Sequence, residues 1–330
     1  MSNPETNKNT STRNRTLTAA MIVCGAVLVA AAVLAFTGVF GAVAGRYENA
    51  DRYTAGNAEI TGTVRNLDIE WTSGKVIFAG HAGSTVALSE RADGQIPADM
   101  QLRWWLDGDT LRVRFAKSGA RTGRLFGLFG SLSKELTLTL PEGIELGEVS
   151  VDTASASVEI GRLRAESVKM DSASGAIGVT AQRVGSFRAD TASGAVRFTA
   201  EEAGDVRAET ASGAISFDVR QAGTVRAESA SGAIHAEFGS LDSGELEAVS
   251  GSVTVKTGSF NSLNVSTVSG RVAANLPQEP GFTATVSTVS GRVENGLALQ
   301  QSGNTYVCGD GSARVRISTT SGGIRIDPAE

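Results

Sequence analysis

Apolar and polar residues alternate in short runs along most of the chain, and these runs recur at a fixed spacing. "RADTASGAVRF" begins at Arg188 and "RAETASGAISF" begins at Arg207, 19 positions later. Alternation with a period of two predicts β-strands, because successive side chains of a strand point to opposite faces. We therefore predict two short strands in each unit, joined by a tight structural turn at a Ser-Gly pair. The most regular of these pairs are Ser174-Gly175, Ser193-Gly194, Ser212-Gly213 and Ser231-Gly232.

Residues one unit apart form columns of similar character. Val196, Ile215 and Ile234 form a β-branched column, and Phe198 and Phe217 share another. One such unit cannot bury an apolar face alone, whereas stacked units can. The fold class we predict is all-β, a parallel β-solenoid with about 19 residues per coil over 146–327.

Two further features of the β region follow from the pattern. We expect residues 58–145 to form an N-terminal β segment that caps the solenoid. In this segment "DIEWTSGKVIF" around Ser73 has the shape of a repeat unit, whereas about 75–145 depart from the period and predict further strands, with a hairpin turn at Asp107-Gly108. Glycines at a fixed position in successive units predict a second turn, where we expect left-handed backbone. These glycines are Gly185, Gly204 and Gly223.

The N-terminus predicts a membrane anchor. Residues 16–45 carry no charge and exceed the roughly 20 residues that span a bilayer. Basic residues in 1–15 favour a cytoplasmic tail there and an extracytoplasmic location for the bulk of the chain, with 46–57 as a linker. The alternative is a secreted protein, released by cleavage of a signal peptide after Ala44.

Composition narrows the chemistry. The net charge of -5 gives no support for nucleic-acid binding, which needs a basic surface. With only Cys24, Cys308, His81 and His235 as sulfur and imidazole ligands, we expect no metal and no other cofactor. The Ser-Gly serines would be nucleophiles only if one of them had a base in reach, and seven near-identical copies argue against that.

Two charged columns repeat with the unit. A base and an acid two residues apart share one strand face, which predicts a solvated ladder of ion pairs on the outer surface. The alternative is a calcium-binding row of acids, although the glycine-aspartate nonapeptide of calcium-binding β-rolls is absent. The ladder residues are Arg188, Asp190, Arg207, Glu209, Arg226 and Glu228.

The segment "GRLFGLFGSLSK", from 123 to 134, is apolar and flanked by bases. It predicts a contact with a partner or with the membrane through Arg124, Phe126, Leu128 and Phe129. The alternative is a loop that folds onto the cap.

Three stretches together resemble a known family: "DIEWTSGKVIF", "LTLTLPEGIELGEVSVDTASASVEI" and the series of "SASGAI" and "TVSGRV" units. From about residue 58 to its end the chain is similar to the bacterial "putative adhesin" family of β-strand-repeat envelope proteins. The resemblance implies a membrane-anchored, extracytoplasmic β-solenoid and supplies no catalytic residues.

The function we predict is that of a non-enzymatic adhesin or envelope scaffold with a protein or cell-wall partner. One alternative is an accessory or regulatory protein in envelope-stress signalling. A less favoured one is a polysaccharide-acting β-helix enzyme, which would need a carboxylate cluster that breaks the repeat. We expect function to lie where the period breaks, between about 75 and 145 or in the insertion after Leu276.

Overall fold

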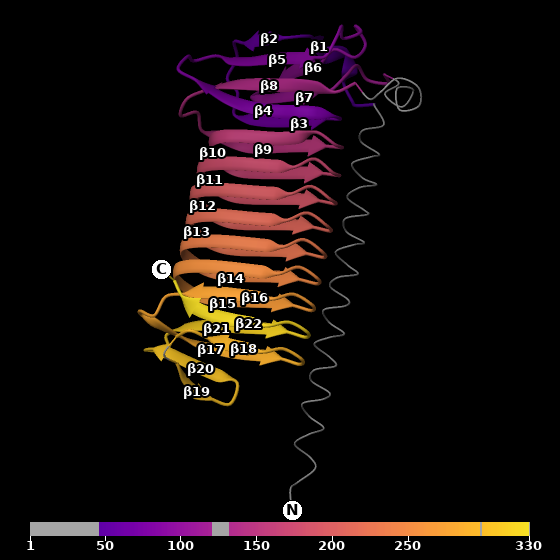
Figure 1. Cartoon of the computed structure of the whole chain (residues 1–330). Coiled ribbons are helices and arrows are strands. Elements are labelled where there is room, and N and C mark those ends of the chain that lie inside the picture. The colour runs from indigo at the N-terminus through magenta and orange to yellow at the C-terminus, as the bar shows by residue number, and fades with distance from the viewer. Residues whose placement is uncertain (1–45, 121–131, 298, 330) are drawn as a thin grey trace, which may run out of the picture.

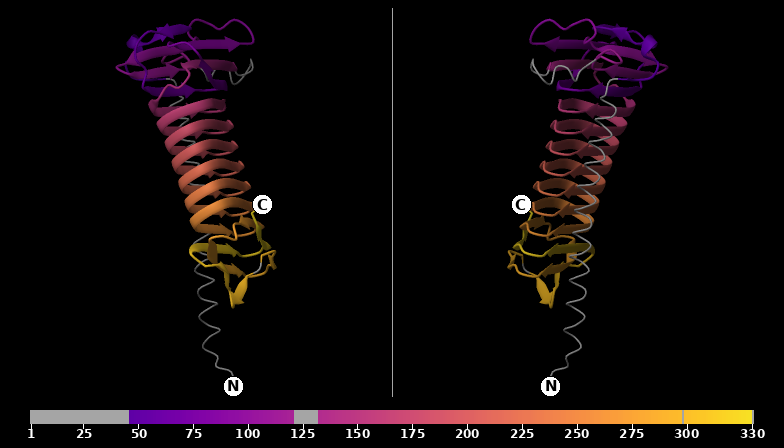
Figure 2. Two further views of the ribbon diagram at one scale, coloured as in Figure 1. Left: turned by 90° about the vertical axis from the view of Figure 1, so that its left-hand side faces the viewer. Right: turned by 90° about the vertical axis from the view of Figure 1, so that its right-hand side faces the viewer.

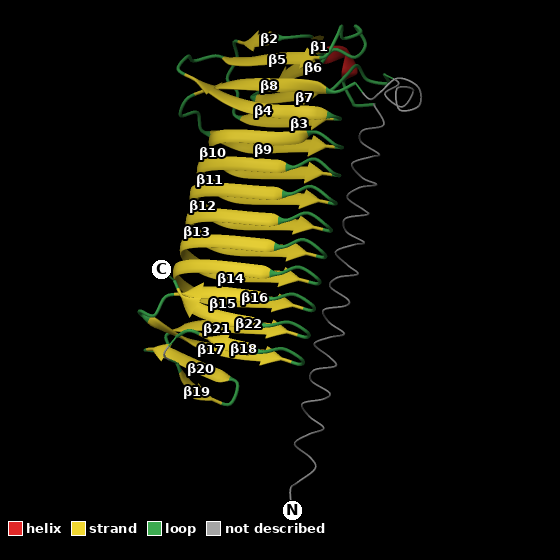
Figure 3. Cartoon of the chain, in the orientation of Figure 1, coloured by secondary structure: helices red, strands yellow, loops and turns green. Residues whose placement is uncertain are grey.

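The computed structural model describes residues 46–120, 132–297 and 299–329, and these residues form an elongated stack of β-coils (Figures 1 and 3). The described strands belong to one continuous hydrogen-bonded sheet that winds around the stack. The all-β prediction and the largely parallel stacking are confirmed. No helix in the described part is long and apolar enough to cross a membrane. The predicted anchor at 16–45 lies outside the described residues.

Six long strands form the regular part of the stack. Each pairs in parallel with the next at an offset of one unit, as in Ile177↔Val196 and Val196↔Ile215. Each unit is a single bent strand, where two were predicted, because the hydrogen-bonded ladder continues through the second bend (Figure 2). The strands are β10 (Ser157–Ser172), β11 (Ile177–Thr191), β12 (Val196–Thr210), β13 (Ile215–Ser229), β14 (Ile234–Ala248) and β15 (Val253–Thr267).

The predicted apolar columns lie inside the coils. Phe198 and Phe217 are fully buried, and the ring of Phe187 stacks on that of Phe198 with centroids 4.1 Å apart. Small residues such as Ala189 and Ala208 are equally buried beside them. Large and small side chains therefore fill the narrow interior together, as close packing requires.

The second bend needs glycine for a reason other than the predicted one. Gly185, Gly204 and Gly223 do not have positive φ. Instead, a Cβ on Gly185 would lie 2.6 Å from the carbonyl oxygen of Glu166 in the preceding coil. The requirement is therefore close approach of stacked backbones at this bend, not left-handed geometry.

The N-terminal strands both cap and extend the stack. Strand β3 pairs in parallel with β7 and β9, and β4 pairs with β8 and β10, so the coil of β3 and β4 lies between segments that follow it in sequence. The cap is antiparallel, with β6 and β7 joined at Asp107-Gly108 as predicted. The bounds are β1 (Thr54–Ala55), β2 (Ala58–Ile60), β3 (Asn66–Trp71), β4 (Gly74–His81), β5 (Val86–Ala92), β6 (Arg103–Asp107), β7 (Thr110–Arg114), β8 (Lys134–Pro141) and β9 (Leu146–Thr153).

Residues 46–57 are part of this cap, and the prediction of a linker there is wrong. They contain a 3-10 helix (Ala50–Arg52) and β1, which pairs with β6. The Tyr53 ring packs against Tyr47 and Trp105, with centroids 4.7 and 5.7 Å away. Burial of these aromatic rings holds the segment on the fold.

The other end repeats the same rearrangement. Strand β21 lies between β15 and β17, and β22 lies between β16 and β18. The last coil in sequence is therefore inserted before the coil that precedes it, and β19 and β20 pair antiparallel at the end (Figure 1). The bounds are β16 (Val272–Leu276), β17 (Gly281–Thr288), β18 (Val293–Asn295), β19 (Gln300–Ser302), β20 (Thr305–Gly309), β21 (Ala313–Thr319) and β22 (Ile324–Pro328).

Candidate functional site

The Ser-Gly pairs lie in the short connections between consecutive long strands. Ser193 and Ser212 are exposed, whereas the glycine of each pair is buried against the glycine of the neighbouring coil. In the described residues, no hydrogen bond joins a serine of the four predicted pairs to a histidine or a carboxylate. The geometry thus gives these serines a position at the corner without an activating base.

A different hydroxyl column supports each corner, and the sequence reasoning did not identify it. The Gly213 amide donates to Thr210 Oγ1 at 2.8 Å, and the Gly194 amide donates to Thr191 Oγ1 at 2.9 Å. Thr191 and Thr210 are 5 and 2% exposed. The sequence does carry a signal for this column, because a Thr or Ser stands two positions before most of the Ser-Gly serines. These hydroxyls satisfy buried amides that strand pairing leaves free.

The predicted charged columns lie on the outer face formed by the second halves of β11, β12 and β13. Arg188 Nε lies 2.7 Å from Asp190 Oδ2, and Arg188 Nη2 lies 3.8 Å from Glu209 Oε1 in the next coil. Arg207 and Glu209 form the equivalent pair, as do Arg226 and Glu228. Each arginine therefore lies near acids of one or two coils.

The acids of this ladder are sheltered, where a solvated ladder was predicted. The side chains of Asp190 and Glu228 are 15 and 7% exposed, against 46% for Arg188. Burial raises the pKa of Asp190, although the neighbouring Arg188 guanidinium opposes the rise. The described ranges contain no group of three or more His, Cys, Asp or Glu side chains placed to hold a metal ion.

One coil near the capped end lacks a base at the ladder position, although its neighbours keep the pairs Arg114–Glu70 and Lys169–Asp171. Asp152 stacks between Glu70 and Asp171, and its own coil carries Ser150 where the next coil has Lys169. Burial, followed by the Asp171 carboxylate, raises the pKa of Asp152 to about 7. This carboxyl therefore shares its site with like charges that are only partly compensated.

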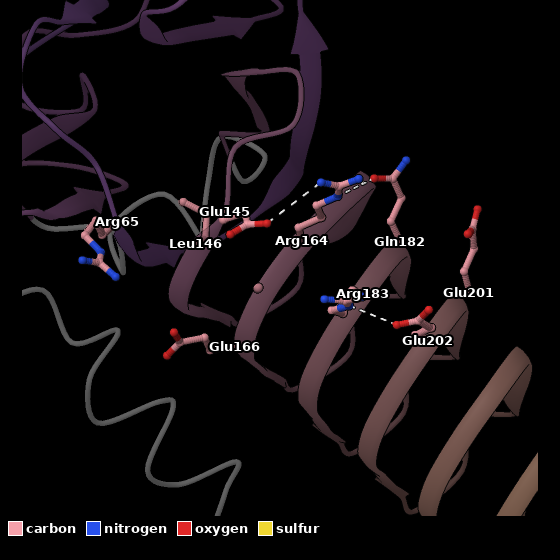
Figure 4. A pocket seen from close by; sticks show the side chains of 10 residues that line it. Arg65, Glu145, Leu146, Arg164, Glu166, Gln182, Arg183, Glu201 and Glu202 are labelled. Atoms are coloured by element: carbon pink, nitrogen blue, oxygen red, sulfur yellow. Dashed lines mark hydrogen bonds and ion pairs between the residues drawn. The ribbon is translucent and has the colours of Figure 1, made fainter.

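A groove follows the second bend of the coils. It consists of two adjoining hollows of about 390 and 750 Å³ that share Gln182 and Glu201. Figure 4 shows the first hollow, where Arg164 Nε donates to Gln182 Oε1 at 2.7 Å and Arg183 pairs with Glu202 at 3.0 Å.

Charges of both signs continue along this corner groove. Arg220 pairs with Glu201 at 3.9 Å, and Lys256 pairs with Glu237 at 3.2 Å. Arg164 also lies 4.0 Å from Glu145 at the capped end. The groove thus presents ion pairs across several coils without a strong excess of either sign.

The cap contains a buried cation, Lys134, which the sequence analysis counted only among the bases that flank the apolar segment 123–134. Lys134 is 1% exposed, and its Nζ lies 2.8 Å from Glu90 Oε2. It also donates to the carbonyl oxygen of Met100 and lies 4.8 Å from the centre of the Trp71 ring. Burial lowers the pKa of Lys134, while Glu90 opposes this. Lys134 therefore joins the strands of the cap; the predicted contact residues Arg124, Phe126, Leu128 and Phe129 lie outside the described residues.

The fold and these surfaces define a repeat protein of the β-solenoid class. The family model described as Toastrack DUF4097 matches residues 64–327. The chain therefore belongs to this family, whose function is not established, and the predicted resemblance to a domain-of-unknown-function adhesin family is confirmed.

Comparison with solved structures gives low similarity. A "putative adhesin" from Bacteroides fragilis is 11% identical over 82% of this chain and 95% of its own, with a TM-score of 0.41. A "putative lipid binding protein" from Parabacteroides distasonis is 12% identical over 82 and 95%, with a TM-score of 0.42. A "putative cell adhesion protein" from Clostridium sporogenes is 11% identical over 83 and 100%, with a TM-score of 0.21. No curated protein sequence matches the chain.

Proposed function

We propose that this protein is a non-enzymatic scaffold or adhesin of the cell envelope, anchored through 16–45 and carrying its solenoid outside the membrane. Its binding surface is the corner groove, and its ligand is an extended wall polysaccharide. The observation that carries the proposal is the groove itself, which runs along successive coils and not into one enclosed pocket.

The chemistry of the groove supports this kind of ligand. Ion-paired groups such as Arg183 and Glu202 offer both donors and acceptors to sugar hydroxyls. The coils rise by about 4.8 Å each, so similar groups recur along the groove. A linear polymer contacts many such weak sites at once, which raises its overall affinity without a deep pocket. Exposed large apolar side chains are scarce on the described surface, where Val289 is the one example.

The proposal is tested by co-sedimentation of the detergent-solubilised full chain with purified cell-wall sacculi. The double variant Arg164→Ala and Arg183→Ala removes two groups of the groove and should reduce the bound fraction several-fold. Arg197→Ala is the matched control, because Arg197 is exposed and lies outside the groove. Equal retention of wild type and double variant would contradict the proposal, as would capture of a membrane protein without any wall binding.

A further inference from the structure

A third hollow of about 520 Å³ lies on the ladder face near the C-terminal end of the stack. Six outward side chains line it in two rows across β15, β21 and β17. The pairing registers place Arg314 between Ser262 and Thr283, and Arg316 between Asn264 and Thr285. The hollow therefore has two arginines at its centre and hydroxyl or amide groups on both sides.

These arginines break the pairing rule of the face. Through successive registers, Arg316 continues the column of Arg188, but the position two residues later holds Ser318 where the earlier coil has Asp190. Arg314 stands in a column that contains Ser243 and other hydroxyl residues. This coil therefore keeps the base of the ladder as Arg316, has a second base in Arg314, and carries Ser318 in place of the acid.

The consequence is local positive charge on an acidic protein. Among the residues that the structure describes, no carboxylate lies within 4.0 Å of either guanidinium. On the other face of the same two coils, by contrast, Arg325 pairs with Asp327 at 2.5 Å and Arg292 lies 4.0 Å from Glu294. The arginines on the other face of these coils are thus paired with acids, whereas Arg314 and Arg316 are not.

The side chains around the arginines indicate what they bind. Two planar guanidinium groups suit an oxyanion, which they hold through paired N–H donors. Ser262, Asn264 and Thr285 supply further donors and acceptors beside them. The apolar side chains of these strands point inward, with Leu263 and Val315 only 2 and 3% exposed, so the outward side chains that line the hollow are polar.

We propose that this surface, the Arg314/Arg316 site, binds an acidic sugar unit: a carboxylate or phosphate group held by the two arginines, with its neighbouring hydroxyls held by Ser262, Asn264 and Thr285. A densely charged polymer such as a nucleic acid fits less well. Glu245 and Glu247 lie in the adjoining coil, on β14, and would repel its additional charges. The site shares no residue with the corner groove and stands independently of it.

The test is titration calorimetry of the solubilised full chain with three probes, each a single sugar unit: galacturonate, galactose 6-phosphate and neutral galactose. Binding of either acidic probe supports the site and identifies its oxyanion, and the neutral probe should not bind. Arg314→Gln with Arg316→Gln should weaken acidic-probe binding at least about tenfold, and added salt should weaken the wild-type interaction. Arg292→Gln, on the other face, is the matched control and should leave binding unchanged.

A second variant separates binding from folding. Arg314→Lys with Arg316→Lys keeps both charges but removes the planar donor fork, so it should fold normally and bind between wild type and the glutamine variant. Thermal unfolding followed by circular dichroism checks that all variants are folded. Absence of acidic-probe binding to the wild type, or equal binding by wild type and the glutamine variant, would overturn the proposal. Loss of wall binding through the corner-groove variants would leave it unaffected.

Discussion

Replacing Asp152 with asparagine should stabilise the protein above neutral pH. Asp152 lies between Glu70 and Asp171 in the acid column and has no base in its own coil at the ladder position. Burial and the Asp171 carboxylate raise the pKa of Asp152 from its ordinary value of 3.8 to about 7. The folded protein therefore holds this proton more tightly than the unfolded chain does.

The sign of the pH effect follows from this difference. Below about pH 4 the carboxyl is protonated in both states and makes no difference to stability. Between about pH 4 and pH 7 the unfolded chain releases this proton while the folded state retains it, so the free energy of unfolding falls as pH rises and levels off above about pH 7. One pKa unit corresponds to about 1.4 kcal/mol, which gives about 4 kcal/mol for the full shift. Solvent screening of the part-exposed carboxyl reduces the expected gain for Asp152→Asn to about 1–3 kcal/mol at pH 8.

Urea unfolding of wild type and Asp152→Asn between pH 4 and pH 9 measures the effect. The difference in free energy of unfolding should be near zero at pH 4 and reach its maximum above pH 7. Glu209→Gln is the matched control, because Glu209 pairs with Arg207 and its removal should lower stability at pH 8. A difference for Asp152→Asn that does not change with pH, or that is negative at pH 8, would refute the reasoning.

Three further predictions concern a close backbone approach, a buried hydrogen bond and a buried ion pair. Gly213→Ala should lower the free energy of unfolding in urea by about 3 kcal/mol or more, because the added Cβ would overlap a carbonyl oxygen of the preceding coil. Gly178→Ala is the control and should be nearly neutral, since its added Cβ would lie 3.7 Å from the nearest backbone oxygen. Thr210→Val should cost about 1–3 kcal/mol because it leaves the buried Gly213 amide unpaired, and faster hydrogen exchange at that amide would show the cause. Lys134→Met should lower the free energy of unfolding, measured by thermal unfolding, by about 3–5 kcal/mol, because it leaves the buried Glu90 carboxylate without its cation. The second substitution Glu90→Gln should recover part of this loss, and the absence of any recovery would contradict the explanation.

The sequence by itself determined the unit and its interior. Alternation identified the strands, the 19-residue spacing identified the coils, and the columns through Phe198 and Val196 identified the core, because a stack of equal units places equivalent residues above one another. The hairpin at Asp107-Gly108 was also predictable, since a turn depends on local residues. The ladder pairs followed from the same rule, because residues two apart share a strand face.

Tertiary structure alone decided the order of the end coils and the environment of the charges. Nothing in a local pattern states that β21 pairs with β15 and separates it from β17, because many similar strands compete for each edge. The shelter of Asp190, the burial of Lys134 and the position of Arg316 between β15 and β17 likewise depend on neighbours distant in sequence. Repetition specifies what each coil contains, and contacts between coils decide which of its charges are paired, buried or free to bind.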